Sequence, residues 1–271
     1  NVIIFLTYLY YTTYFGLQVA PEKSILIPTA HDEPPIYYSI FNETFNLPRA
    51  ILYSTTTERD FVNKRFKNNY IKSDIVGLGV DINENTQDID LEKTFGIKDD
   101  FVIYVGRIDE SKGCKEMFEY FLEYKKNYKN NLKLVLAGKN VMNIPKHKDI
   151  LVLGFVSEDE KINLIKQAKL LVLPSKFESL SLSTLESMYL GTPVLLNGEC
   201  KVLKEHAILS NGGLYYENKW EFIEALNYLI EDPKTSEKMG ENGRKYVNKN
   251  YKWDVVMKKL KETIEFVNKS Y

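Results

Sequence analysis

The chain has 271 residues, of which 44% are hydrophobic and 27% charged, the composition of an ordinary globular protein. This excludes a largely disordered or fibrous protein, and the length favours about two domains. The 36 Lys and Arg side chains balance 37 Asp and Glu, which argues against nucleic acid as the main partner. Two cysteines, Cys114 and Cys200, and three histidines do not suggest a disulfide framework or a metal site, and they fit a reducing compartment.

The N-terminal segment from Val2 to Val19 carries no charge and is rich in aromatic and β-branched residues. It is just long enough to span a bilayer. Its composition instead favours a buried strand followed by a short helix or loop. It lacks the basic start and the small-residue cleavage site of a signal peptide. We therefore interpret it as part of a folded domain.

Further short apolar runs predict the other strands of a first domain at residues 1–82. Helical patterns separate these runs, and the loop that contains His31 reads HDEPP, in which two prolines prevent regular strand pairing. The polar, acidic stretch 83–94 predicts a linker. The predicted strands are 25–28, 50–55 and 74–82, and the predicted helices are 37–45 and 57–66.

From Phe101 onward, strands that are apolar throughout alternate with helices. This pattern predicts a parallel sheet covered on both faces, with ligands at the carboxyl ends of the strands. Ser157 and Glu160 form a capping box before one of the helices. The predicted strands are 101–106, 132–138, 150–156, 170–174 and 192–196, and the predicted helices are 112–128, 158–168, 183–190, 218–231, 234–249 and 252–268.

One motif at a strand end is GRIDESKG, which spans Gly106 to Gly113 and opens a helix. Arg107 and Lys112 lie on either side of this loop and would form a cationic clamp for phosphate, helped by the positive end of the helix. The alternative is surface charge, with Arg107 paired to Asp109 or Glu110.

A second motif, PSKFESLSLSTLESMYLGTPV, follows another strand and runs from Pro174 to Val194. Glu178 and Glu186 would lie near the mouth of the sheet and could accept hydrogen bonds from sugar or ribose hydroxyls. Backbone N–H groups of residues 179–182 could bind an anion. The alternatives are a solvent-facing Glu178 and a Glu186 that only caps a helix with Ser183.

Together the two motifs resemble the second domain of glycosyltransferase family 4, a large family of retaining enzymes with the GT-B fold. That domain carries G-R-x-x-x-x-K-G, then P-S-x-x-E-x7-E and G-x-P-V, which here read GRIDESKG, PSKFESLSLSTLE and GTPV. The resemblance covers about residues 25–271. It implies an α/β protein with two Rossmann-like domains, the second of which, at 95–252, binds a nucleotide sugar.

The resemblance also implies roles for individual residues. Arg107 and Lys112 would hold the donor diphosphate. Glu186 would bind the ribose hydroxyls, and Glu178 would contact the transferred sugar. Further nucleotide contacts would come from Gly154, Phe155 and Val156 around the base and from the backbone at Leu180, Ser181 and Leu182.

His31 is the third candidate. A lone histidine is more often structural, but the first domain of the family often has a histidine followed by an acidic residue and proline, which implies that His31 lies near the sugar in a catalytic site. His147, in a predicted surface loop, and His206, at the end of a short predicted helix, match no motif.

The chain also departs from the family pattern. The family has glycines in E-G-F-G, where this chain has Ser179, Leu180 and Ser181 after Glu178. Glycine permits close backbone approach, so serine would narrow the site or alter the sugar preference. The family's N-terminal glycine-rich loop and first strands have no counterpart, so we expect an incomplete first domain. The segment 253–271 resembles the helix that crosses back onto that domain.

A metal site is not expected. Asp88 and Asp90 in DID resemble the D-x-D of metal-dependent transferases, but they lie in the acidic linker, where solvated charges are the simpler interpretation. Family-4 enzymes generally need no metal, because Arg, Lys and a helix N-terminus neutralise the leaving diphosphate.

These observations predict a retaining glycosyltransferase that uses a UDP- or GDP-linked sugar, needs no separate cofactor and acts on a glycan or lipid-linked acceptor. The resemblance implies a cytoplasmic protein of glycan biosynthesis with peripheral contact to the inner membrane face through the basic helix from Arg59 to Lys67. A solvated helix face is the alternative for that helix. The alternative functions are a catalytically silent, transferase-like binding subunit and a GT-B nucleotide-sugar epimerase.

Overall fold

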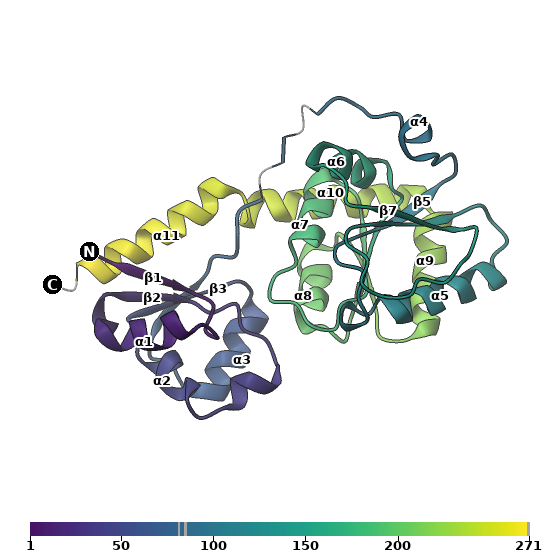
Figure 1. Cartoon of the computed structure of the whole chain (residues 1–271). Coiled ribbons are helices and arrows are strands. Elements are labelled where there is room, and N and C mark those ends of the chain that lie inside the picture. The colour runs from purple at the N-terminus through teal and green to yellow at the C-terminus, as the bar shows by residue number, and fades with distance from the viewer. Residues whose placement is uncertain (81, 84–85, 270–271) are drawn as a thin grey trace. The chain divides into compact units, whose positions relative to one another are not determined.

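The computed structural model describes residues 1–80, 82–83 and 86–269, and it divides into two compact units (Figure 1). The first unit contains residues 1–79, 177–180 and the chain from Asn250 onward. The second contains residues 80–176 and 181–249. The chain therefore leaves the first unit at Gly79, three residues before the end of the first domain expected from sequence.

The first unit is built on a parallel sheet with strand order β1-β2-β3-β4. Side chains alternate between its two faces, as in any strand. Leu26, Ile51 and Tyr53 therefore pack in one apolar cluster, with Val62 of α3, while Ile25, Ala50 and Leu52 pack in another, with Val256 and Val267 of α11. The elements are β1 (Ile3–Leu6), α1 (Tyr11–Val19), β2 (Ser24–Ile27), α2 (Phe41–Asn46), β3 (Ala50–Tyr53), α3 (Thr56–Phe66), β4 (Lys72–Ile75) and α11 (Trp253–Asn268), with 3₁₀ turns η1 (Pro21–Lys23) and η2 (Pro34–Tyr37).

The expectation that the first strand is buried is wrong. Ile3 and Ile4 of β1 are about two-fifths exposed, at 40% and 39%, and Leu6 is 58% exposed. The reason is topological, because within the described residues β1 pairs only with β2 and forms an edge of the sheet. Strand composition predicts pairing but does not reveal which strand lies at an edge.

The strand predicted at 74–82 is also shorter than expected, because β4 ends at Ile75. Beyond it, two glycines make room for aromatic rings from the start of the C-terminal segment. A Cβ at Gly77 would lie 2.7 Å from the Tyr251 ring, and one at Gly79 would overlap Trp253. Gly77 also has φ +66°, which favours glycine. The glycines therefore serve packing and do not extend the strand.

The second unit contains a larger parallel sheet with the order β10-β9-β8-β5-β6-β7. The four inner strands, β9, β8, β5 and β6, are almost entirely buried, as expected when helices cover both faces, whereas the edge strands β7 and β10 are partly exposed. The strands are β5 (Phe101–Val105), β6 (Lys133–Ala137), β7 (Ile150–Gly154), β8 (Leu171–Leu173), β9 (Val194–Asn197) and β10 (Gly213–Tyr216), and the helices are α4 (Leu91–Phe95), α5 (Cys114–Asn127), α6 (Glu158–Gln167), α7 (Leu182–Leu190), α8 (Lys201–Ser210), α9 (Lys219–Glu231) and α10 (Pro233–Asn250), with the 3₁₀ turn η3 (Glu110–Lys112).

Three elements of this unit differ from the expectation. Within the predicted linker, Asp90 accepts a hydrogen bond from the Lys93 N–H and caps the short helix α4, so this carboxylate has a local structural role. Strand β10 was not predicted. His206 lies inside α8 and is fully buried, with Nδ1 3.1 Å from the Tyr246 hydroxyl oxygen, whereas the sequence placed it at a helix end.

None of the helices in the described part of the chain is both long enough and apolar enough to cross a bilayer. The uncharged segment Val2–Val19 forms β1 and α1 instead.

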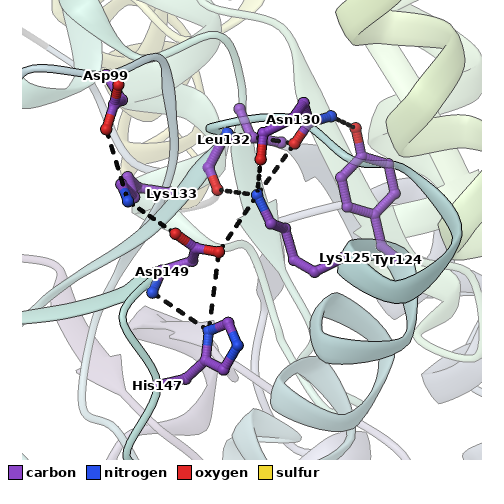
Figure 2. Close-up of polar contacts among 8 residues, drawn as sticks. All are labelled: Asp99, Tyr124, Lys125, Asn130, Leu132, Lys133, His147 and Asp149. Carbon is purple, nitrogen blue, oxygen red and sulfur yellow. Dashed lines mark hydrogen bonds and ion pairs between the residues drawn. The ribbon is translucent and has the colours of Figure 1, made fainter.

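At the amino ends of β6 and β7, a cluster of charged side chains ties α5 to the sheet (Figure 2). Asp149 is buried and lies 2.7 Å from Lys133 Nζ and 3.3 Å from Lys125 Nζ. Lys125 also donates to the carbonyl oxygens of Asn130 and Leu132. The Asp149 N–H donates to His147 Nδ1 at 3.2 Å. Burial disfavours the Asp149 charge, but the two lysines outweigh it and hold the pKa of Asp149 below its usual value.

Replacing Asp149 with asparagine should destabilise the protein by about 3 kcal/mol, because two lysines would lose the counter-charge of a buried pair. The parent should also lose stability below about pH 4, since a carboxyl whose pKa is lower in the folded state stabilises it only while ionised. Urea unfolding at several pH values measures both effects. Glu241→Gln, which breaks an exposed pair with Lys238, is the control and should change stability by at most about 0.5 kcal/mol. Equal effects from the two variants would contradict this account.

Candidate functional site

Most of the residues predicted to bind the donor gather at the carboxyl edge of the second sheet. Arg107 and Lys112 lie in the loop after β5, and Gly154 to Val156 are at the end of β7. The segment that begins at Pro174 follows β8, which lies beside β5 in the sheet. In a parallel sheet these ends share one edge, the usual location of a ligand in a doubly wound fold.

Arg107 is held by two neighbours. The hydroxyl of buried Tyr104 donates to the Arg107 carbonyl oxygen at 2.7 Å. The Arg107 Nε lies 3.1 Å from Asp109 Oδ2, so the pairing considered as an alternative is present. It engages one of the five guanidinium N–H donors, and the side chain is 56% exposed. Asp109 was not predicted as a site residue; the Ser111 N–H and the charge of Arg107 lower the pKa of its carboxyl.

Gly113 brings the two motifs together. It has φ +75°, and a Cβ there would overlap the carbonyl oxygen of Pro174. The backbone that follows Lys112 therefore packs directly on the first residue of the second motif, and α5 begins at the next residue, Cys114. The Pro174 carbonyl also accepts a hydrogen bond of 2.9 Å from Asn197, at the end of β9. A side chain at residue 113 would prevent the contact between Gly113 and Pro174 that joins the two motifs.

Ser181 adopts a conformation that favours glycine. It precedes α7 with φ +69°, and its side chain makes no capping hydrogen bond to the backbone. Its Oγ instead lies 2.9 Å from Thr184 Oγ1. Leu180 is buried and Leu182 is 44% exposed, while Glu178 is half-buried. Ser181 thus has a left-handed backbone, a conformation that glycine adopts more readily than serine.

Glu186 does not cap α7, so the capping interpretation with Ser183 is wrong. The helix starts after Ser181, and Glu186 Oε1 lies 2.9 Å from Lys161 Nζ. The Glu186 side chain is 19% exposed and that of Lys161 17%. Burial raises the pKa of Glu186, and the charge of Lys161 opposes this. No sequence motif singles out Lys161, because Lys161 and Glu186 are 25 residues apart.

The end of β7 presents an aromatic ring to solvent. Gly154 has φ +74°, and its carbonyl accepts a hydrogen bond of 2.7 Å from the Gly138 N–H. After this turn Phe155 is 81% exposed, and Val156 is half-buried. An exposed ring beside a strand end is a surface on which a planar base can stack.

In the first unit, His31 lies in the loop after β2. Its Nε2 is 3.4 Å from Glu33 Oε2, while Glu33 Oε1 accepts a hydrogen bond of 2.8 Å from the Tyr8 hydroxyl. The other ring nitrogen of His31, Nδ1, is buried and has no hydrogen-bond partner among the described residues. The Glu33 carboxylate therefore anchors one side of the imidazole.

A buried carboxylate, Glu58, ties this loop to the sheet. Glu58 Oε1 accepts from the Ala30 N–H at 2.5 Å, and Oε2 accepts from the Ser54 N–H at 2.6 Å. Ala30 precedes His31 and follows Thr29, whose φ of +51° is unusual for a residue other than glycine. We did not predict this role. The signal was T-x-x-E, since Thr55 Oγ1 accepts from the Glu58 N–H at 3.1 Å and caps α3.

Burial raises the pKa of Glu58 to about 7, against the effect of its backbone donors. An acid with a raised pKa binds its proton more tightly in the folded state, so stability should fall as pH rises from about 4.5 to about 7. The fall should be roughly 3 kcal/mol, at about 1.4 kcal/mol per pKa unit. Denaturant unfolding should show it in the parent and in exposed Glu43→Gln but not in Glu58→Gln. An unchanged slope in Glu58→Gln would refute the assignment.

The other charged candidates have local partners. Arg59 forms an ion pair of 3.1 Å with Asp60, and Arg65 donates to the Tyr37 carbonyl oxygen while its guanidinium lies over the Tyr37 ring. His147 belongs to the cluster around Asp149 (Figure 2). Within the described residues, no three His, Cys, Asp or Glu side chains come together in a way that could hold a metal ion.

Comparisons with known proteins point to one family. Residues 86–246, more than half of the chain, match the family model of glycosyl transferases group 1. An uncharacterized glycosyltransferase from Methanocaldococcus jannaschii is 28% identical over 195 residues, which cover 66% of this chain and 48% of that protein. The alpha-1,3/1,6-mannosyltransferase ALG2 of Dictyostelium discoideum is 26% identical over 235 residues, covering 79% of this chain and 54% of that protein.

Among solved structures, Anabaena HepE in complex with UDP matches 97% of this chain and 78% of its own, with a TM-score of 0.78 at 13% identity. The same protein has also been solved with UDP-glucose.

The chain therefore belongs to the group 1 glycosyl transferases, as the motifs predicted. It has the GT-B fold class, with two Rossmann-like α/β units on parallel sheets. The chain spans about half the length of the curated relatives that it matches.

Proposed function

We propose that this chain binds a nucleotide-diphospho-sugar and serves in glycosyl transfer to an acceptor hydroxyl. The observation that carries the proposal is the packing of Gly113 on Pro174, which joins the Arg107–Lys112 loop to the segment leading into α7. Arg107 and Lys112 then lie in a loop that adjoins the segment before α7, at one edge of the sheet. Helix α5 begins after the first of these segments, and helix α7 begins after the second. Such an arrangement suits a diphosphate.

The reaction breaks the bond between the anomeric carbon and the diphosphate oxygen, and the electron pair leaves with the diphosphate. Arg107 and Lys112 would stabilise the charge that develops there, and each charge-assisted contact is worth about 1.5–3 kcal/mol. The acceptor oxygen forms the new bond to the anomeric carbon, and its proton passes to the departing diphosphate oxygen. We propose retention of configuration, as the resemblance to glycosyltransferase family 4 implies. We also propose that no metal is needed, because Arg107 and Lys112 supply the neutralising charge.

The other candidates would hold the rest of the donor. Phe155, with Gly154 and Val156, would contact the base. Glu186 would accept hydrogen bonds from the ribose hydroxyls. His31 and Glu178 would contact the transferred sugar. The Glu33 carboxylate on one side of His31 supports this role, because a carboxylate partner orients an imidazole ring.

The donor would be linked to UDP or GDP, and the solved complexes of HepE with UDP and UDP-glucose favour UDP. The acceptor would be a glycan or a lipid-linked glycan at the inner membrane face. A thermal-shift screen against UDP, GDP and ADP, each with its sugar derivatives, tests the donor class, because a bound ligand raises the unfolding temperature. No shift with any of them would overturn the proposal.

A second candidate function is a transferase-like binding subunit without catalysis. The serine at position 181, which must adopt a left-handed conformation at the start of α7, favours it. The two functions predict different outcomes. A binding subunit would show the thermal shift but would neither transfer nor hydrolyse a nucleotide sugar, whereas a transferase would consume it.

Lys112→Ala should weaken UDP binding roughly 10- to 100-fold, the equivalent of one charge-assisted contact. It should leave uridine binding unchanged, because uridine has no phosphate. Isothermal titration calorimetry with both ligands measures this, and an unfolding curve verifies the fold. Lys115→Ala, which removes an exposed lysine from the first turn of α5, is the control and should behave like the parent. If both variants bind UDP equally well, Lys112 does not hold the diphosphate.

A further inference from the structure

Glu186 has a specific ionic partner that no motif predicts. Its Oε1 lies 2.9 Å from the Nζ of Lys161, on α6. The lysine also lies 2.9 Å from Glu158 Oε1, one turn earlier in the same helix. The Glu158 side chain is 66% exposed, whereas Glu186 and Lys161 are both more than four-fifths enclosed. The contact with Glu186 is therefore the better shielded of the two and the less screened by solvent.

The position of Lys161 is fixed by the start of α6. The Ser157 N–H donates to Glu160 Oε2 at 2.7 Å, and the Glu160 N–H donates to Ser157 Oγ at 3.3 Å. The Lys161 N–H then closes the first turn on the Ser157 carbonyl at 2.9 Å. This capping box directly follows Val156. Lys161 thus joins Glu186 on α7 to the segment proposed to hold the base.

The charge of Lys161 favours the ionised form of Glu186. Burial favours the neutral acid at this position and raises its pKa, and Lys161 opposes the rise. Glu158, also on α6, raises the pKa of Glu186 as a like charge. Burial lowers the pKa of Lys161, but its two carboxylate partners, Glu158 and Glu186, outweigh this effect and raise the pKa. The lysine therefore stays charged. An ionised carboxylate accepts hydrogen bonds through both oxygens, and Lys161 engages Oε1.

We propose that Lys161 is a positioning residue for ribose recognition, which holds the Glu186 carboxylate so that it accepts hydrogen bonds from the 2′ and 3′ hydroxyls of a ribonucleoside diphosphate. The inference rests on the proposed function. It assigns Lys161 no contact with the ligand, and it makes discrimination between ribose and deoxyribose depend on a side chain in the neighbouring helix.

The test compares the affinities for UDP and 2′-deoxy-UDP by isothermal titration calorimetry at pH 7. The parent should bind UDP about 10- to 100-fold more tightly, since a site built to bind a hydroxyl loses its hydrogen bond with the deoxy ligand. Lys161→Met should reduce this ratio to near 1. The ratio should recover as pH rises, because Glu186 then ionises without its counter-charge. Lys161→Arg, which restores the cation, should retain most of the preference.

Lys204→Met is the matched control, because Lys204 also pairs with a carboxylate, that of Glu217, but Lys204 lies on another helix, α8. It should keep the parent ratio. A parent ratio retained in Lys161→Met at pH 7 would overturn the inference. Should Lys161→Met not fold, Lys161→Gln takes its place, with the same ratio near 1 expected and an unchanged ratio overturning the inference.

Failure of the proposed function has a different signature. A parent that binds no ribonucleoside diphosphate would overturn both proposals before any variant is compared. A parent that discriminates and loses discrimination in Glu186→Gln but not in Lys161→Met would overturn only the role of Lys161.

Discussion

The close approach of Gly113 to the Pro174 carbonyl is the constraint on which the arrangement of the two motifs depends. It requires a residue without a side chain in a left-handed conformation, and it lets the loop after β5 rest on the segment after β8. Without it the two motifs would be separate loops on neighbouring strands. With it, the backbone that follows the basic loop rests on Pro174, the first residue of the second motif.

Asp149 and Arg107 show how enclosure changes what an ion pair does in this protein. At the amino ends of β6 and β7, Asp149 is buried between two lysines and contributes to stability (Figure 2). At the carboxyl edge, Arg107 is paired but more than half exposed, so its partner can orient it without removing it from solvent. The same ionic chemistry thus stabilises the fold where it is enclosed and remains available to a ligand where it is open.

The serine at position 181 shows how the family pattern and the structure relate. The motif has glycine there, and the backbone of this chain retains the conformation that glycine prefers, with φ +69°. A serine in this conformation is strained, and its hydroxyl is held by Thr184.

The sequence by itself determined the class of fold and the family motifs that follow the strands of the second unit, because apolar runs, capping signals and short motifs are local patterns. It could not identify β1 as an exposed edge strand, Lys161 as the partner of Glu186, or Glu58 as the anchor of the His31 loop. Only the tertiary structure decided these, because each depends on residues far apart in the sequence. The Ala30 N–H and the Glu58 carboxylate are 28 positions apart, and burial between them has no local signature.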